Sequence, residues 1–154
     1  MSIERARAHL KKHGLEDRIQ EFTVSSATVA LAAQALGCEP ARIAKSLSFE
    51  NGEGAVLVIA AGDARIDNAK FKHRFGMKAK MLSADKVEPL IGHGVGGVCP
   101  FGVKDGVPVY LDESLKRFET VYPAAGTPSS AVHLSLEELE RASECEGWVD
   151  VCKQ

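Results

Sequence analysis

The spacing of hydrophobic positions along the chain predicts short helices and short strands that follow one another without a regular repeat. Apolar residues three or four positions apart are typical of helices, and alternating or continuous apolar runs are typical of strands. Helical spacing predicts helices over residues 3–13, 27–36, 68–75, 83–90 and 136–143, with brief helical turns after Pro40 and over residues 112–118. The apolar runs predict strands over residues 19–24, 44–49, 55–61, 77–81, 107–111, 120–123, 130–134 and 148–152.

Boundary residues agree with this division. Asn51-Gly52 is a favoured turn between two strands, so the strands on either side of it are expected to form a β-hairpin. Capping residues are expected before four of the helices, namely Ser2, Ser25 or Ser26, Asp67, and Ser135 with Glu138 as a capping box. The alanine-rich second helix is expected to be buried. The elements together predict one domain over residues 1–154, of the α/β class with a mixed, strongly curved sheet.

Composition excludes several classes of protein. The chain is 45% hydrophobic and 26% charged, which is ordinary for a soluble globular domain. No apolar run approaches the roughly 20 residues of a membrane helix, and the N-terminus does not begin a signal peptide, so we expect a cytoplasmic protein without membrane contact. The four cysteines form no C-x-x-C pair and have no histidine at metal spacing beside them. We therefore expect reduced thiols, no metal site and no cofactor.

Charge is unevenly distributed although the net charge is only −2. This total argues against indiscriminate binding to nucleic acid and gives no indication of a DNA partner. Residues 65–80, however, carry six lysines and arginines against one acidic residue. Lys70, Lys72 and Arg74 lie on the helix predicted there and would present a basic patch to a phosphate backbone. The alternative is an ordinary solvated helix face.

The most unusual segment is residues 91–102, where five glycines and Pro100 fall within eleven positions. Such a run favours a fixed loop over a helix or a regular strand, because glycine accepts positive φ and proline removes a hydrogen-bond donor. Gly92, Gly94 and Gly97 satisfy the dinucleotide pattern G-x-G-x-x-G, but no long strand precedes them and no helix follows. The loop instead predicts main-chain N–H groups that hold anionic oxygen.

Three side chains are candidates for chemistry, two of them outside this loop and one within it. Lys45 would share a strand face with Ile43 and Leu47, so its ammonium must reach water or meet an anion. His133 lies in a predicted strand, where a structural role is as compatible as a functional one. Cys99 lies in the glycine loop and could be a nucleophile, but activation needs a lowered pKa and a neighbouring base.

Taken together, three segments resemble the YbaK family of aminoacyl-tRNA deacylases, which is associated with prolyl-tRNA synthetase. They are Arg42-Ile43-Ala44-Lys45-Ser46-Leu47, Gly96-Gly97-Val98-Cys99-Pro100 with Phe101-Gly102, and residues 125–134 with the sequence AGTPSSAVHL. They occur in the family's order, and the similarity spans nearly the whole chain. The resemblance implies a barrel-like mixed sheet with surrounding helices, and an enzyme that hydrolyses the ester of mischarged tRNA.

The resemblance also implies roles for individual residues. Lys45 would anchor the 3′-terminal nucleotide of the substrate, and Gly96, Gly97 and Val98 would supply main-chain N–H groups for catalysis. The expected substrate-binding residues are Ser46, Cys99, Pro100, Phe101, Ser129, Ser130 and His133. The resemblance implies the acceptor end of an aminoacyl-tRNA as the partner and leaves open whether an aminoacyl-tRNA synthetase is a second one. A non-catalytic module that binds tRNA or a small ligand in the same pocket is the main alternative, and a cysteine hydrolase that uses Cys99 is a further one.

Overall fold

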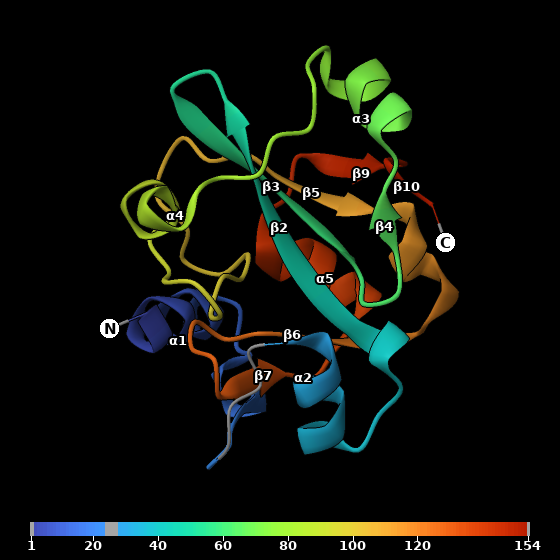
Figure 1. The fold of residues 1–154 in the computed structure, drawn as a ribbon. Coiled ribbons are helices and arrows are strands. Elements are labelled where there is room, and N and C mark those ends of the chain that lie inside the picture. The colour runs from blue at the N-terminus through green and yellow to red at the C-terminus, as the bar shows by residue number, and fades with distance from the viewer. Residues whose placement is uncertain (1, 24–27, 154) are drawn as a thin grey trace.

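A six-stranded mixed sheet forms the centre of the protein, and the computed structural model describes residues 2–23 and 28–153 (Figure 1). In spatial order its strands are β8 (Leu134–Ser135), β6 (Thr120–Pro123), β2 (Ile43–Asn51), β3 (Gly54–Ala61), β5 (Val109–Asp112) and β9 (Gly147–Val149). Pairing is antiparallel for β2–β3 and β6–β8, and parallel for β2–β6, β3–β5 and β5–β9. The sheet curls into a half-barrel, which confirms the predicted mixed and strongly curved architecture.

Two short antiparallel pairs flank the central sheet. β1 (Ile19–Glu21) pairs with β7 (Ser130–Val132), and β4 (Arg65–Ile66) pairs with β10 (Cys152–Lys153). The strand predicted over residues 130–134 is therefore divided between β7 and β8, which pair with different partners on either side of His133. The strand predicted over residues 148–152 is divided in the same way between β9 and β10.

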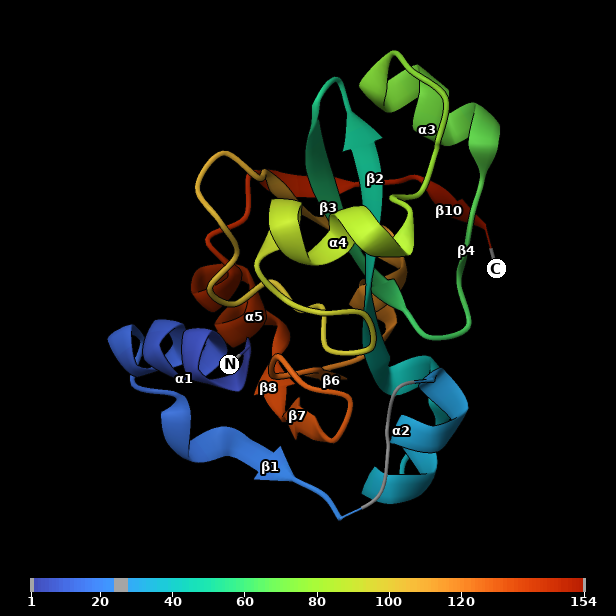
Figure 2. The ribbon, with the colours of Figure 1, turned by 60° about the vertical axis from the view of Figure 1, so that its left-hand side comes forward.

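The helices surround this sheet. They are α1 (Ser2–Lys12), α2 (Val29–Leu36), α3 (Asn68–Phe75), α4 (Ala84–Ile91) and α5 (Leu136–Ser143), with 3-10 turns over Glu16–Arg18, Pro40–Arg42 and Glu113–Arg117. α4 lies in front of the β2–β3 hairpin and α5 behind it (Figure 2). Because both faces are covered, β3 is an almost continuous apolar run whose residues from Ala55 to Ala61 are all buried.

Two of the predicted caps are present, whereas Ser2 lies within α1 itself. The Asp67 side chain accepts a hydrogen bond from the Lys70 amide at 3.0 Å, and Ser135 and Glu138 form the capping box of α5. The cap predicted at Ser25 or Ser26 falls outside the described residues. The N-cap of α2 is Thr28, whose hydroxyl accepts from the Leu31 amide at 3.1 Å. Only part of α2 is buried, since Leu31 on its outer face is 42% exposed.

One predicted strand is wrong. Residues 77–81 do not form a strand, and the only ladder contact of this segment is an isolated bridge between Met81 and Phe49. The Glu50 amide donates to the Lys80 carbonyl at 2.8 Å, and the Leu82 amide donates to the Ser48 carbonyl at 3.1 Å. The segment therefore borders β2 only briefly before α4 begins. This contact closes one end of the cavity described next.

Candidate functional site

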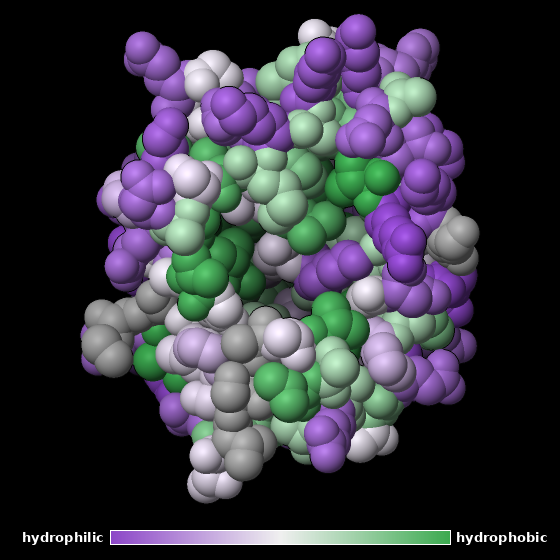
Figure 3. All heavy atoms as spheres, in the orientation of Figure 1, coloured by the Kyte–Doolittle hydropathy of each residue, from purple (hydrophilic) through white to green (hydrophobic). Residues whose placement is uncertain are grey.

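A cavity of about 330 Å³ opens between β2, α2, α4 and the glycine loop. Hydrophobic side chains gather around the hollow that Figure 3 shows near the centre of this face. The lining residues are Thr28, Val29, Ala32, Ile43, Ala44, Lys45, Ser46, Ser48, Met81, Leu82, Ala84, Val87, Val95, Gly96, Val98, Tyr122, Ala124, Ser130 and Ala131. Among these described residues, Lys45 is the only charged one, and none is a carboxylate, a histidine or a cysteine.

The glycine loop is held from both of its ends. Gly92 ends α4 in the left-handed region with φ of 100°, and the Arg5 side chain of α1 lies against it. Near the other end, the Arg5 Nε donates to the Gly102 carbonyl at 2.8 Å. A Cβ at Gly102 would lie 2.5 Å from the Arg5 carbonyl oxygen, so only glycine fits where α1 meets the loop.

Two main-chain amides of this loop remain available at the cavity. The Gly97 amide donates to the Gly94 carbonyl at 3.0 Å and is thereby used within the loop. Among the described residues, no acceptor bonds to the amides of Gly96 or Val98, and both residues line the cavity. Unpaired main-chain N–H groups at a cavity wall are donors for an anionic or carbonyl oxygen.

Lys45 lies on β2 at the same cavity. Its Nζ donates to the Gly62 carbonyl at 3.3 Å and to the Ala64 carbonyl, both in the segment between β3 and β4. Burial lowers the pKa of the Lys45 ammonium, and the nearby Asp63 acts in the opposite direction. An ammonium has three N–H donors, so two carbonyl partners leave one for a ligand. The regular pairing of β2 with β3 places Lys45 and Leu47 on the same strand face, as predicted. Leu47 packs against the core and does not line the cavity.

Ser46 lines the cavity at the edge of β2 that faces away from β3. The bonds of Ser48 and Glu50 to residues 80–82 show that even-numbered residues of β2 direct their main-chain groups away from β3. Ser46 therefore directs its own amide and carbonyl to the same edge, past the point where the pairing with β6 ends at Ala44. Its hydroxyl is buried and has no partner among the described residues. A ligand in the cavity could satisfy these groups.

Ser130 organises the segment behind the glycine loop. Its buried hydroxyl accepts from the amides of Ala125 and Thr127 at 3.2 and 3.3 Å and donates to the Thr127 carbonyl at 3.1 Å. These bonds fix the turn at Gly126. Gly97 packs against that turn so closely that a Cβ on Gly97 would lie 2.5 Å from the Gly126 carbonyl oxygen. The hydroxyl of Ser130 therefore helps to hold the glycine loop in place, because it fixes the turn against which Gly97 packs.

The structure does not bring every predicted site residue to the cavity. Lys45, Ser46, Gly96, Val98 and Ser130 line it, whereas Gly97, Cys99, Pro100, Phe101, Ser129 and His133 do not. Phe101 is fully buried, and its ring lies 6.1 Å from that of His9. Pro100 lines a different cavity beside α1. His133 stacks on Tyr122 at 4.4 Å and so supports a lining residue from behind.

Cys99 points into the core. Its thiol is fully buried, 3.5 Å from Nε2 of His93, and burial raises the thiol pKa to about 12. Such a thiol stays protonated near neutral pH and is a poor nucleophile. The geometry therefore gives no support to a cysteine hydrolase.

A Cys99→Ala variant is expected to hydrolyse substrate at a rate of the same order as the parent protein, because the thiol does not reach the cavity. Some loss of thermal stability is expected, since the change leaves a small gap in a packed core. Single-turnover hydrolysis with parent and variant side by side measures the effect. Loss of all turnover, or an acyl group trapped on the parent thiol, would contradict this assignment.

The basic residues predicted to contact nucleic acid lie on α3, and none of them lines the cavity. Lys70 is occupied within the protein, since its Nζ bonds to Asp150 and to the Cys152 carbonyl, both at 3.1 Å. The Arg74 guanidinium lies 5.3 Å from the ring centres of both Phe75 and Tyr110. Lys72 is exposed.

Several cavity residues were missed by sequence reasoning. Met81 and Val95 form an apolar rim and are 57% and 66% exposed. Tyr122 and the α2 residues Thr28, Val29 and Ala32 form another part of the wall. Of these residues, only Val95 could have been selected from the sequence, because it is an apolar residue within the glycine run. The others reach the cavity through tertiary packing that no short motif records.

The fold and this cavity define a member of the aminoacyl-tRNA editing domain family, whose model matches residues 23–142 of the chain. The resemblance inferred from the three segments is confirmed at the level of this family. The chain is 49% identical to the uncharacterized protein YwhH of Bacillus subtilis (strain 168) over 154 residues, which cover 99% of this chain and 98% of that protein.

Two further relatives connect the chain with prolyl-tRNA synthetase. It is 31% identical over 139 residues to the proline–tRNA ligase of Shouchella clausii (strain KSM-K16), covering 86% of this chain but only 24% of the ligase. A solved structure described as a candidate trans-editing enzyme for prolyl-tRNA synthetase matches with a TM-score of 0.88 and 31% identity, covering 99% of this chain and 98% of that one. Among the described residues, no helix is long and apolar enough to span a membrane.

Proposed function

We propose that this protein is a trans-acting editing hydrolase that cleaves the ester bond of mischarged aminoacyl-tRNA, with tRNA(Pro) carrying a small non-cognate amino acid as the substrate. One observation carries the proposal. In a chain of the aminoacyl-tRNA editing family, Lys45, Gly96 and Val98 line the same cavity, and no described acceptor bonds to the amides of Gly96 and Val98. An ammonium and a pair of fixed donors suit a phosphate and a reacting carbonyl, respectively.

The chemistry requires little more than these groups. Ester hydrolysis develops negative charge on the carbonyl oxygen, and each preorganised main-chain donor at that oxygen is worth roughly 2.7–4 kcal/mol. In the proposed complex, Gly96 and Val98 donate to this oxygen, while Lys45 holds the phosphate of the 3′-terminal nucleotide. The described lining contains no histidine, cysteine or carboxylate that could act as a base. Water is therefore activated by the substrate's own groups.

The size and polarity of the cavity support a small amino acid. Its volume of about 330 Å³ lies near the lower end of the roughly 300–1,000 Å³ that is usual for ligand pockets. Much of its wall is apolar, with Val29, Ile43, Leu82 and Val87 among the lining residues. The unpaired hydroxyl and amide of Ser46 offer hydrogen bonds on the β2 side. Cysteine and alanine fit this combination.

Hydrolysis of a panel of aminoacyl-tRNAs tests the proposal. The panel contains tRNA(Pro) charged with cysteine, alanine or proline, and the release of free amino acid is measured over time. We expect rapid release of at least one small non-cognate amino acid and slow release of proline. No release above the spontaneous rate, together with retained tRNA binding, would instead identify a non-catalytic binding module.

The acceptor stem is proposed to contact α3, where Lys72 is the exposed lysine. A Lys72→Glu variant is expected to weaken tRNA binding and to reduce the slope of log affinity against log salt by on the order of one, as loss of a phosphate contact does. Lys70→Glu is the companion variant, but it also breaks the bonds of Lys70 to Asp150 and Cys152. Lys11→Glu on the exposed side of α1 is the matched control. An unchanged slope in the Lys72 variant would exclude α3 from the contact.

A further inference from the structure

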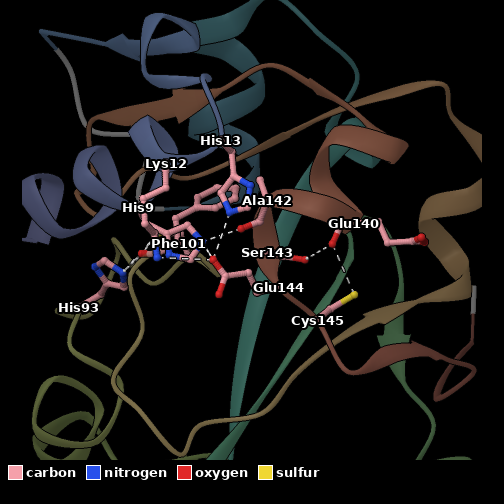
Figure 4. Close-up of polar contacts among 11 residues, drawn as sticks. His9, Lys12, His13, His93, Phe101, Glu140, Ala142, Ser143, Glu144 and Cys145 are labelled. Atoms are coloured by element: carbon pink, nitrogen blue, oxygen red, sulfur yellow. Dashed lines mark hydrogen bonds and ion pairs between the residues drawn. The ribbon is translucent and has the colours of Figure 1, made fainter.

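A cluster of two imidazoles and one carboxylate joins α1 to the end of α5, away from the proposed editing site. His9 lies on α1, His13 directly follows that helix four residues later, and Glu144 directly follows α5. Figure 4 shows both imidazoles and the Glu144 carboxylate pointing toward one another. None of these three residues lines the cavity that contains Lys45.

The distances match a metal site. Nε2 of His9 and Nε2 of His13 lie 3.3 and 3.1 Å from the same oxygen, Oε2 of Glu144, and all three ligand atoms lie within 4.8 Å of one another. Ligand atoms at about 2.0–2.1 Å from a tetrahedral Zn²⁺ are roughly 3.3–3.4 Å apart. Both nitrogen–oxygen separations thus already approximate the edge of such a tetrahedron.

Glu144 reaches this position through a backbone conformation that is unfavourable for residues other than glycine. Glu144 caps α5 in the left-handed conformation with φ of 53°, and it is the only described residue other than glycine with a positive φ. Glycine or asparagine is the usual residue there. A glutamate that tolerates this conformation turns its carboxylate toward α1. Strained positions of this kind often occur where a side chain has a function.

We propose that His9, His13 and Glu144 bind a divalent transition-metal ion, with Zn²⁺ as the best match to their chemistry and spacing. Imidazole nitrogen and carboxylate oxygen are both established zinc ligands, and three protein ligands leave a fourth position open. His9, Lys12, Ser143 and Glu144 border a second cavity of about 540 Å³, from which water completes the coordination. The ion would link α1 to the end of α5.

The His9 imidazole has a main-chain hydrogen-bond partner that metal binding would replace. Without metal, Nε2 of His9 donates to the Ala142 carbonyl at 2.5 Å. On binding, the ring turns slightly, its proton moves to Nδ1 through solvent, and Nε2 offers its lone pair to the ion.

The Lys12 ammonium would compete with the metal ion for the Glu144 carboxylate. Nζ of Lys12 lies 3.6 Å from Oε2 of Glu144 and its side chain is 64% exposed, so the ammonium can turn away into water. Arg5 and Lys104 also border the second cavity but are bonded to the carbonyls of Gly102 and Pro89 at 2.8 Å. Removal of the Lys12 charge should therefore favour the metal.

Titration of the chelator-treated full chain with Zn²⁺, against a chromophoric competitor, tests the site. We expect one ion per chain, a rise in thermal stability on binding, and an affinity at least about tenfold weaker in His13→Gln and in Glu144→Gln. His73→Gln, which changes an exposed histidine on α3, is the matched control and should bind as the parent does. Lys12→Met should bind more tightly, and this gain cannot result from misfolding.

A Co²⁺ complex gives the ligand type by its absorption, since cysteine thiolates add an intense near-ultraviolet band that imidazole and carboxylate do not. Such a band, equal affinities in His13→Gln and His73→Gln, or no tighter binding in Lys12→Met would overturn the proposal. Aminoacyl-tRNA hydrolysis by His13→Gln should be unchanged. The metal site and the editing function therefore succeed or fail separately.

Discussion

Replacement of Lys45 by alanine is expected to lower kcat/KM for hydrolysis of mischarged tRNA by at least about 100-fold, the scale reported for loss of one preorganised charge-stabilising group. Lys45 is the only charged residue in the described cavity lining, so no neighbour can replace its ammonium. The expected cause is loss of the phosphate anchor, which misplaces the ester relative to Gly96 and Val98. Steady-state release of free amino acid measures the change.

Two controls separate this effect from damage to the fold. Lys45→Ala also removes bonds to the Gly62 and Ala64 carbonyls, so its unfolding temperature is measured beside that of the parent. Lys45→Met keeps most of the side-chain volume without the charge and should lose activity to the same extent. Lys11→Ala changes an exposed lysine on α1 outside the cavity and should keep its hydrolytic rate. A Lys45→Met enzyme that works at the parental rate would remove the lysine from the mechanism.

The second large effect is expected at Gly97. A Cβ at this position would lie 2.5 Å from the Gly126 carbonyl oxygen and 2.7 Å from the Thr127 Cα, and both contacts are with main-chain atoms. Gly97→Ala must therefore displace either the glycine loop or the turn that Ser130 fixes. We expect a loss of about 1–3 kcal/mol in the free energy of unfolding and a fall of at least about 100-fold in kcat/KM. Denaturant titration and the hydrolysis assay measure the two effects.

The same loop provides a matched control for Gly97. A Cβ at Gly94 would find its nearest neighbour, a side-chain oxygen of Glu88, at 3.9 Å. Gly94→Ala is therefore expected to keep both stability and activity near the parental values. Equal tolerance of the two substitutions would show that the close approach of Gly97 to the Gly126 turn does not matter for catalysis.

Local signals in the sequence predicted much of the fold. The continuous apolar run of β3, the hairpin turn at Asn51-Gly52 and the capping box at Ser135 each depend on neighbouring residues, and each is present as predicted. The strand over residues 77–81 failed because its apolar alternation finds no extended partner, only the bridge to Phe49. The division of the strand at His133 also depends on which distant strands are available to pair.

The candidate site was predictable only in part. Lys45 and the glycine run could be selected from the sequence, because a lysine in an apolar strand and five clustered glycines are locally unusual. Cys99 was a further alternative as a nucleophile, but its side chain turns into the core beside His93. Met81, Tyr122 and α2 contribute walls that carry no local signal. The cluster of His9, His13 and Glu144 was missed for the same reason, because its residues come from opposite ends of the chain.

The sequence alone predicted most of the periodic elements, the irregular nature of the glycine run and the family resemblance, because all three depend on residues close together along the chain. The tertiary structure alone decided which faces meet. The edge of β2 is left open at Ser46 because β6 pairs only as far as Ala44 and residues 80–82 begin to pair only at Ser48. Gly96 and Val98 line the same cavity as Ser46, because Arg5 and the Gly126 turn hold the loop from two sides. Such long-range contacts depend on packing between distant segments, which no local pattern encodes.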